Sequence, residues 1–188
     1  MNHRPPGRRR ALALTLAAAL ATLAGPTQAG DKPQPQLVVN SGFIRDGGAV
    51  PKKYTADGDD VSPPLRWDDP PAATKSFAIT CEDPDAPGGT WFHWIIYNLP
   101  PSTRRVKEAV AKTPTVPDDI RQGTNDFGKL GYNGPSPPKG KPHHYHYKVF
   151  ALDKMLELKP GCKKGAFYAA LKGHILARGQ LVATYGRQ

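Results

Sequence analysis

The stretch from residue 81 to residue 100, CEDPDAPGGTWFHWIIYNLP, constrains the fold more than any other part of the chain. Its prolines, Pro84 and Pro87, fix the backbone φ angle and remove hydrogen-bond donors, so the segment around them is neither a helix nor an interior strand. Gly88 and Gly89 then permit a chain reversal. The aromatic and β-branched run that follows, WFHWIIYN, predicts a strand.

Three side chains in this stretch can carry chemistry. Asp83 and Asp85 fall in the proline-containing loop, and His93 falls near the start of the predicted strand. Because side chains alternate between the two faces of a strand, we expect His93 to share one face with Ile95 and Tyr97. A rigid loop with two carboxylates beside a histidine predicts the rim of a ligand pocket.

The remaining sequence predicts a mainly β domain, either a sandwich or a barrel. The chain contains 19 glycines and 21 prolines, which interrupt many short β-rich runs. We predict strands at 75–82, 91–99, 143–152 and 174–185, a helix at 163–172, a polar loop at 54–67, and irregular structure at 102–131. The first residues of the strand at 174–185 could instead extend the helix.

The N-terminus has the pattern of a secretory signal peptide. Arginines at 8–10 precede a charge-free run from Ala11 to Ala24, and small residues lie before the expected cleavage after Ala29. A transmembrane anchor is the alternative, but about 14 apolar residues are too few to cross ~30 Å of hydrocarbon. We predict a cleaved signal peptide at 1–29, a flexible lead-in at 30–36, and one domain at 37–188 that is periplasmic or secreted and has no transmembrane segment.

Charge and cysteine content restrict the partners only weakly. The net charge of +10 falls to +6 once the four arginines of the leader are removed, and the remaining basic residues are scattered. No nucleic-acid-binding motif accompanies them, so we expect no nucleic-acid partner and only a mild preference for anions. Export would allow Cys81 and Cys162 to form a disulfide, but a buried free Cys81 is an open alternative.

A second β-rich run, HHYHYKVFAL at 143–152, follows a proline-glycine segment, as the first run follows the Asp83 loop. The period of two places His143 and Tyr145 on one face and His144 and His146 on the other. If both strands belong to one sheet, their starts could converge. The pocket would then contain Asp83, Asp85, His93, His143 and Tyr145.

Several blocks in this order resemble the phosphatidylethanolamine-binding protein family, in particular its bacterial Raf-kinase-inhibitor-like branch. The resemblance covers roughly residues 37–187. The blocks are DGDDVSPPLRW (57–67), EDPDAP (82–87), FHWIIYNLP (92–100), NDFGKLGYNGPSPPKG (125–140), and the histidine and tyrosine that begin the run at 143–152.

The resemblance implies a Greek-key β-sandwich with one or two short helices and a small anion pocket at one end. One departure is His144, which stands where the family usually has an arginine and makes the charge of the rim pH-dependent. The ligand-binding residues that the resemblance implies are Asp83, Asp85, His93, Gly134, Pro137, Pro138, His143 and Tyr145.

We therefore expect an exported ligand-binding or regulatory protein, not an enzyme, with no cofactor. Neutral histidine N–H groups, a tyrosine hydroxyl and loop amides could all donate to a phosphate-like anion or a phospholipid head group. An aspartate beside an anion either orients a histidine or meets the amine of a zwitterionic head group. Inhibition of a protein target is a further expectation.

Two alternatives use the same residues differently. A hydrolase could be built from the Asp and His side chains, although the chain contains no GxSxG sequence. A zinc site could use the same Asp and His side chains as ligands, although no HExxH sequence supports it.

Overall fold

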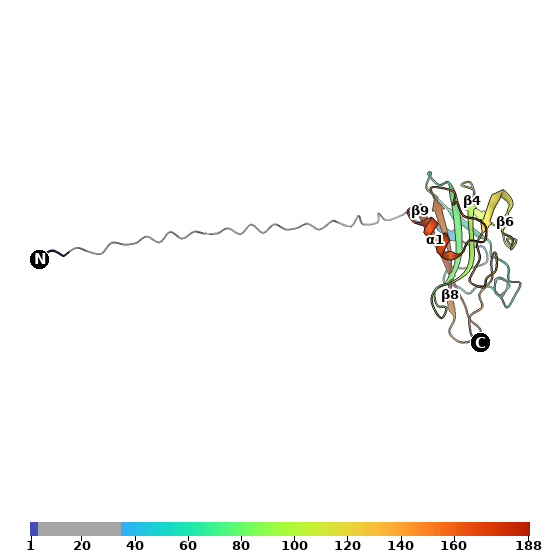
Figure 1. The fold of residues 1–188 in the computed structure, drawn as a ribbon. Helices are drawn as coiled ribbons and strands as arrows, with labels where there is room; N and C mark the ends of the chain where they lie inside the picture. Colours follow the sequence, from blue (N-terminus) through green and yellow to red (C-terminus); the bar gives the residue numbers. More distant parts are fainter. Residues whose placement is uncertain (4–34) are drawn as a thin grey trace. The chain divides into compact units, whose positions relative to one another are not determined.

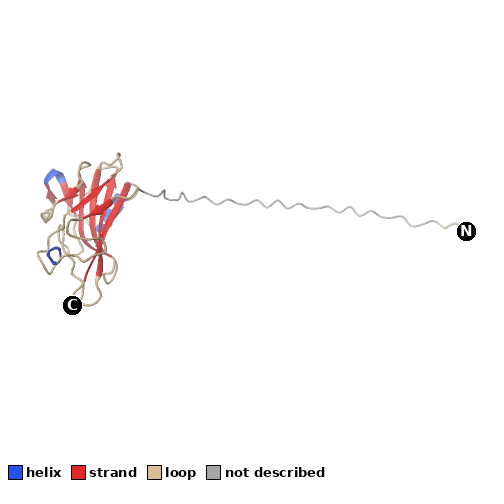
Figure 2. Ribbon diagram, turned by 180° about the vertical axis from the view of Figure 1, so that it is seen from behind, coloured by secondary structure: helices blue, strands red, loops and turns tan. Residues whose placement is uncertain are grey.

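Two antiparallel sheets form the framework of the protein in the computed structural model, which describes residues 1–3 and 35–188 (Figures 1 and 2). Residues 4–29 of the predicted signal peptide lie outside the described part. The division into leader, lead-in and domain stays a prediction. The smaller sheet has the order β1-β2-β5. Its strands are β1 (Val38–Asn40), β2 (Leu65–Asp68) and β5 (Arg105–Val106).

The larger sheet has six strands in the order β6-β7-β4-β3-β8-β9. Within the described residues, one α-helix, α1 (Lys164–Leu171), and two short 3₁₀ turns, η1 (Lys52–Tyr54) and η2 (Pro117–Asp119), complete the fold. The strands are β3 (Ser76–Asp83), β4 (Trp91–Leu99), β6 (Thr115–Val116), β7 (Ile120–Gln122), β8 (His143–Leu152) and β9 (Ile175–Tyr185).

Hydrophobic side chains cover both faces of the larger sheet. The first cluster lies between the two sheets, where the rings of Trp67 in β2 and Phe77 in β3 have centroids 5.1 Å apart. The second lies on the opposite face, where Phe167 and Leu171 of α1 pack with Phe150 of β8. Every residue of β3 is consequently buried, as expected for a strand covered on both faces.

The predicted strands at 91–99 and 143–152 and the predicted helix are confirmed, and the mainly β class is confirmed as two packed antiparallel sheets. Several local predictions are wrong. The region 102–131 contains three short strands, and β2 begins inside the predicted loop 54–67. The predicted last strand is confirmed as β9, because the helix ends at Leu171 and the strand begins at Ile175 after a short turn. Cys81 and Cys162 are both free, which confirms the alternative of a buried free Cys81.

A β-bulge in β4 overturns the predicted orientation of His93. In the pairing with β3, Cys81 is opposite Trp94 and Glu82 is opposite Phe92, which leaves His93 without a partner in the register. An inserted residue of this kind changes which face the following side chains occupy. Ile95 and Tyr97 therefore pack on the helix side, whereas His93 contacts Tyr145 on the face between the sheets.

The start of β8 lies at the same end of the larger sheet as the end of β9, because His143 is paired with Tyr185. The chain terminates at this end (Figure 1). The end of β3, the bulge of β4 and the start of β8 meet here and position the candidate site. No helix in the described part of the chain is long and apolar enough to cross a membrane.

Candidate functional site

A buried carboxylate–imidazole pair joins β3 to β8. Asp83 is the last residue of β3, and its Oδ2 lies 2.8 Å from Nδ1 of His143, the first residue of β8. Only 5% of the Asp83 side chain and 12% of the His143 side chain are exposed. The other carboxylate oxygen, Oδ1, accepts the backbone N–H of Asp85 at 2.9 Å. Both oxygens of Asp83 are thus engaged within the protein.

His93 lies beside this pair in a more enclosed setting. It is 2% exposed, and its Nδ1 is 2.7 Å from the carbonyl oxygen of Asn133. Its ring meets the ring of Tyr145 edge to face, with centroids 5.3 Å apart. Burial lowers the pKa of His93 below its ordinary value, because the apolar surroundings disfavour the charged form. His93 is therefore neutral at neutral pH.

The partners of the two imidazoles fix their tautomers. A carbonyl oxygen and a carboxylate oxygen can only accept, so Nδ1 of His93 and Nδ1 of His143 each carry a hydrogen. In the neutral ring, Nε2 then presents a lone pair instead of a hydrogen. The expectation that neutral histidines donate to an anion is wrong for this geometry, because each ring's one N–H is already used.

Tyr145 supplies the donor that the imidazoles lack. Its hydroxyl is buried and forms no hydrogen bond of normal geometry among the described residues, although the Asp83 carboxylate and the Ser136 backbone are close enough to influence its pKa. Burial, followed by the negative charge of Asp83, raises the pKa of Tyr145, so the hydroxyl keeps its proton. We call Asp83, His93, His143 and Tyr145 the histidine site.

Two aromatic residues beside this site were missed by sequence reasoning. The ring of Phe127 contacts the rings of His93 and Trp91, at centroid distances of 5.3 Å and 5.4 Å. The indole Nε1 of Trp91 is buried and has no hydrogen-bond partner among the described residues. The position of Trp91 two residues before His93 in the predicted strand was a usable signal. Phe127 lies in the region predicted to be irregular (102–131), and no sequence signal pointed to it.

Asp85 does not join the histidine site. Its Oδ2 accepts the backbone N–H of His144 at 2.8 Å and lies 2.7 Å from Nδ1 of the same residue. Both bonds hold the pKa of Asp85 below its usual value, and the bond to the His144 imidazole makes the larger contribution. Asp85 therefore ties the loop after β3 to the start of β8, and His144 is engaged by a carboxylate at the rim.

The proline-glycine segment at 134–142, which we call the arch, supports the site from outside. A Cβ on Gly134 would lie 2.4 Å from the Tyr54 carbonyl oxygen, so only glycine fits this close approach. The N–H of Gly134 donates to Asp60 Oδ1 at 2.6 Å, which leaves this amide unavailable to an anion. The Pro137 carbonyl accepts from Arg187 at 3.3 Å, and Pro138 is exposed.

Asp60 lies in one of the blocks that carry the family resemblance (57–67), but the sequence predicted no role for it. Its Oδ2 accepts from Lys112 at 2.6 Å and from the Asn133 amide at 3.0 Å. Its bonds thus hold the segment whose Asn133 carbonyl fixes the tautomer of His93. Its φ of 54° lies in the left-handed region, which aspartate tolerates better than most residues. Among the described residues, no group of three or more His, Cys, Asp or Glu side chains is placed to hold a metal ion.

Comparison with known proteins gives one consistent result. The family model described as "Phosphatidylethanolamine-binding protein" matches residues 40–186. Over 144 residues, 77% of this chain and 95% of the relative, the sequence is 45% identical to a UPF0098 protein of Methanothermobacter thermautotrophicus. It is 40% identical to the UPF0098 protein YbhB of Escherichia coli over 153 residues, 77% of this chain and 97% of YbhB.

Two crystal structures extend the comparison to the fold. E. coli YbcL, described as a new member of the mammalian PEBP family, superposes with a TM-score of 0.77 and is 32% identical. CT736 of Chlamydia trachomatis superposes with a TM-score of 0.74 and is 35% identical. Each alignment covers 81% of this chain and 99% of the crystallised chain.

Proposed function

This chain belongs to the phosphatidylethanolamine-binding protein family, and on that premise we propose that it is an exported binding protein whose histidine site takes a phosphate group. The phosphate would belong to a small phosphate ester or a phospholipid head group. Family membership supports a ligand-binding or regulatory protein in general. The observation that supports the phosphate site is the buried Tyr145 hydroxyl, which stands beside the Asp83–His143 pair and forms no hydrogen bond of normal geometry among the described residues.

The binding chemistry follows from the hydrogens that the site can offer. The Tyr145 hydroxyl donates to a phosphate oxygen. His143 becomes a second donor when Nε2 takes up a proton, and the Asp83 carboxylate at 2.8 Å from Nδ1 offsets the new positive charge. Binding of an anion without hydrogens of its own is therefore coupled to proton uptake by the protein.

Asp83 has an orienting role in this proposal. Its two oxygens are taken by His143 and by the N–H of Asp85, so it holds the imidazole rather than meeting the amine of the ligand. A ligand with an N–H or P–O–H group has another option, because either hydrogen can be donated to a neutral Nε2. Phosphoethanolamine combines both features, an ammonium group and a phosphate.

Calorimetric titration with phosphoethanolamine at about pH 6 tests the site. Tyr145→Phe keeps the ring and removes the hydroxyl, and we expect it to weaken binding about tenfold, the value of one hydrogen bond to a charged group. The matched control is Tyr168→Phe, because the Tyr168 hydroxyl donates to Glu82 on the other face of the sheet. Unchanged affinity in Tyr145→Phe, or equal losses in both variants, would contradict the proposal.

Export needs a separate test. We expect the protein produced in a Gram-negative host to be recovered from the periplasm or the medium, with Gly30 as its first residue. The measurement is cell fractionation followed by intact mass and N-terminal sequencing. Recovery of the uncleaved chain from the cytosol would contradict export and leave the phosphate site untouched.

A further inference from the structure

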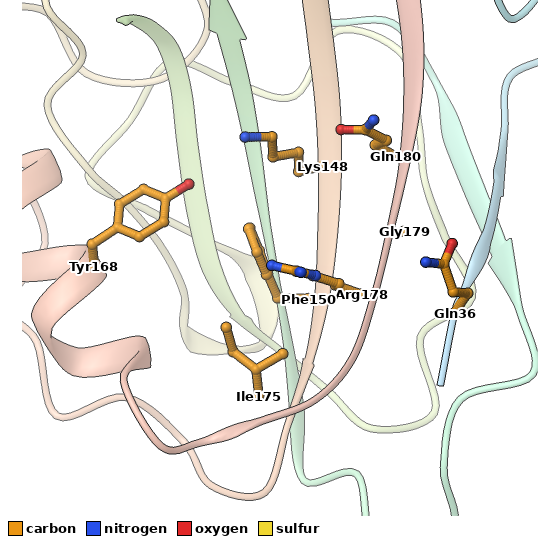
Figure 3. Close-up of a pocket in the computed structure, with 8 residues that line it drawn as sticks. All are labelled: Gln36, Lys148, Phe150, Tyr168, Ile175, Arg178, Gly179 and Gln180. Carbon is orange, nitrogen blue, oxygen red and sulfur yellow. The ribbon is translucent and has the colours of Figure 1, made fainter. Parts of the chain in front are cut away.

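A cavity lies on the opposite face of the larger sheet, away from the histidine site. It has a volume of about 410 Å³, within the range of small-molecule sites. Its lining comes from β8, β9, α1 and Gln36, which precedes β1 (Figure 3). We call it the sheet pocket and define it by Lys148, Phe150, Tyr168, Ile175 and Arg178. None of the site residues predicted from the sequence lines it.

One wall of the sheet pocket is fixed by a buried acid. The carboxylate of Glu82, whose side chain is 5% exposed, accepts from Lys148 Nζ at 2.7 Å and from the Tyr168 hydroxyl at 2.6 Å. Thr80 bonds to the same carboxylate. In Figure 3 the Tyr168 hydroxyl points toward the Lys148 ammonium group. These bonds hold both side chains in place before any ligand arrives, which reduces the entropy lost on binding.

Arg178 contributes a cation whose charge is not neutralised locally. It is directly opposite Phe150 in the β8–β9 register, and in Figure 3 its side chain extends over β8 toward Phe150. Within the described part of the chain, the Arg178 guanidinium forms no ion pair and no hydrogen bond with another protein group. Lys148 and Glu82 neutralise each other, so the pocket has one net positive charge, from Arg178.

The remaining lining is mixed. The side chains of Gln36 and Gln180 contribute amide groups, and Phe150, Tyr168 and Ile175 together provide an apolar wall. The rings of Phe150 and Tyr168 have centroids 6.4 Å apart and meet edge to face, and Ile175 lies at the end of the cavity nearest the start of β9. Aromatic and aliphatic walls beside a single guanidinium match a ligand with one acidic group and a hydrocarbon body. A larger polyanion would leave charges unpaired in this pocket.

We propose that the sheet pocket is a second binding site, which takes a small water-soluble organic monoanion with a hydrocarbon body, such as a medium-chain carboxylate. The carboxylate pairs with the Arg178 guanidinium, and the hydrocarbon lies against Phe150, Tyr168 and Ile175. This site is separate from the histidine site, because its lining faces the helix side of the sheet.

The test is an NMR titration of the full mature chain with octanoate, and with octanamide as its neutral counterpart. We expect octanoate to shift the backbone amides of Phe150 and Gly179 in a saturable way, and octanamide to bind at least tenfold more weakly because the ion pair is lost. Arg178→Gln should weaken octanoate binding at least tenfold. The matched control is Arg105→Gln, another exposed arginine, which lies in the smaller sheet and should change nothing.

Three results would overturn the sheet pocket as a site. The first is equal binding of octanoate and octanamide. The second is equal weakening by Arg178→Gln and Arg105→Gln. The third is a set of octanoate shifts confined to His93, His143 and Tyr145, or their loss when phosphoethanolamine saturates the protein. Failure of phosphoethanolamine to bind would contradict only the histidine site.

Discussion

Glu82 and Asp83 are neighbours in the sequence and end β3 on opposite faces of one sheet. Each is buried, and each is held by a basic side chain of β8, at 2.7 Å from Lys148 and 2.8 Å from His143. The partners differ in kind. The Lys148 ammonium group has only hydrogens to donate, whereas the imidazole of His143, with its Nδ1–H on Asp83, keeps a lone pair on Nε2. Only the pair between the sheets can therefore take up a further proton when a ligand binds.

The difference shows what each face can do. Around Glu82, three donors satisfy the carboxylate, so the pair serves as a wall and leaves Arg178 as the cation available to a ligand. Around Asp83, the imidazole keeps Nε2 free, so the pair itself can respond to a ligand by taking up a proton. The helix-side face is suited to steady binding of a monoanion. The face between the sheets is suited to binding that is coupled to a proton.

The largest expected effect comes from comparing two glycine-to-alanine substitutions, one in the arch and one in α1. Gly134→Ala should lower the free energy of unfolding by about 3 kcal/mol or more, because the new methyl group would overlap the backbone of residues 54–55. Gly165→Ala in α1 meets nothing within 4 Å and should raise it by about 0.5–1 kcal/mol. Urea unfolding measures both. A stable Gly134→Ala protein would show that the arch is not held as closely as the contacts indicate.

The next effect separates the two acid–base pairs. Glu82→Gln should cost about 2 kcal/mol of stability, reduced from the value for a fully buried pair because 31% of the Lys148 side chain is exposed. Asp83→Asn should cost about 1 kcal/mol, because the amide oxygen accepts a weaker hydrogen bond from His143 Nδ1 than the carboxylate does. Urea unfolding of both variants measures the two losses, and a larger loss for Asp83→Asn than for Glu82→Gln would contradict this order.

The smallest effect concerns His93. Its native pKa is lowered by burial, so below about pH 6.5 the unfolded chain binds a proton that the native protein does not. Stability should therefore fall as the pH drops, with a contribution of up to about 1.4 kcal/mol per pH unit from this group. His93→Asn should remove that contribution. The check is thermal or urea unfolding of both proteins from neutral to mildly acidic pH, and identical slopes would contradict the assignment.

Much of the fold could be predicted because its signals are local. The aromatic run before Pro100 and the run after Pro142 predict strands by composition alone, and the period of two correctly places Tyr145 in the core face of β8. The convergence of Asp83, His93, His143 and Tyr145 followed from the positions of these residues at strand ends. The structure brings these four residues together and places Asp85 at the rim.

What the sequence could not show depends on contacts between distant segments. The bulge at His93 is visible only in the pairing with β3, and it reverses the face that simple alternation predicts. Gly134 is required because of Tyr54 and Thr55, which are far away in the chain. The bonds from Lys148 and Tyr168 to Glu82 likewise join β8 and α1 to β3, so the sheet pocket has no signature in any single motif.

The most direct test of the histidine site is to measure proton uptake when an anion binds. Dimethyl phosphate has one negative charge and no acidic hydrogen near neutral pH, so any proton taken up must come to the protein. Calorimetry near pH 7 in two buffers of different ionisation enthalpy gives the number of protons bound. The account predicts uptake of between zero and one proton, because Nε2 of His143 has no hydrogen of its own to donate. Binding with the same enthalpy in both buffers would contradict it.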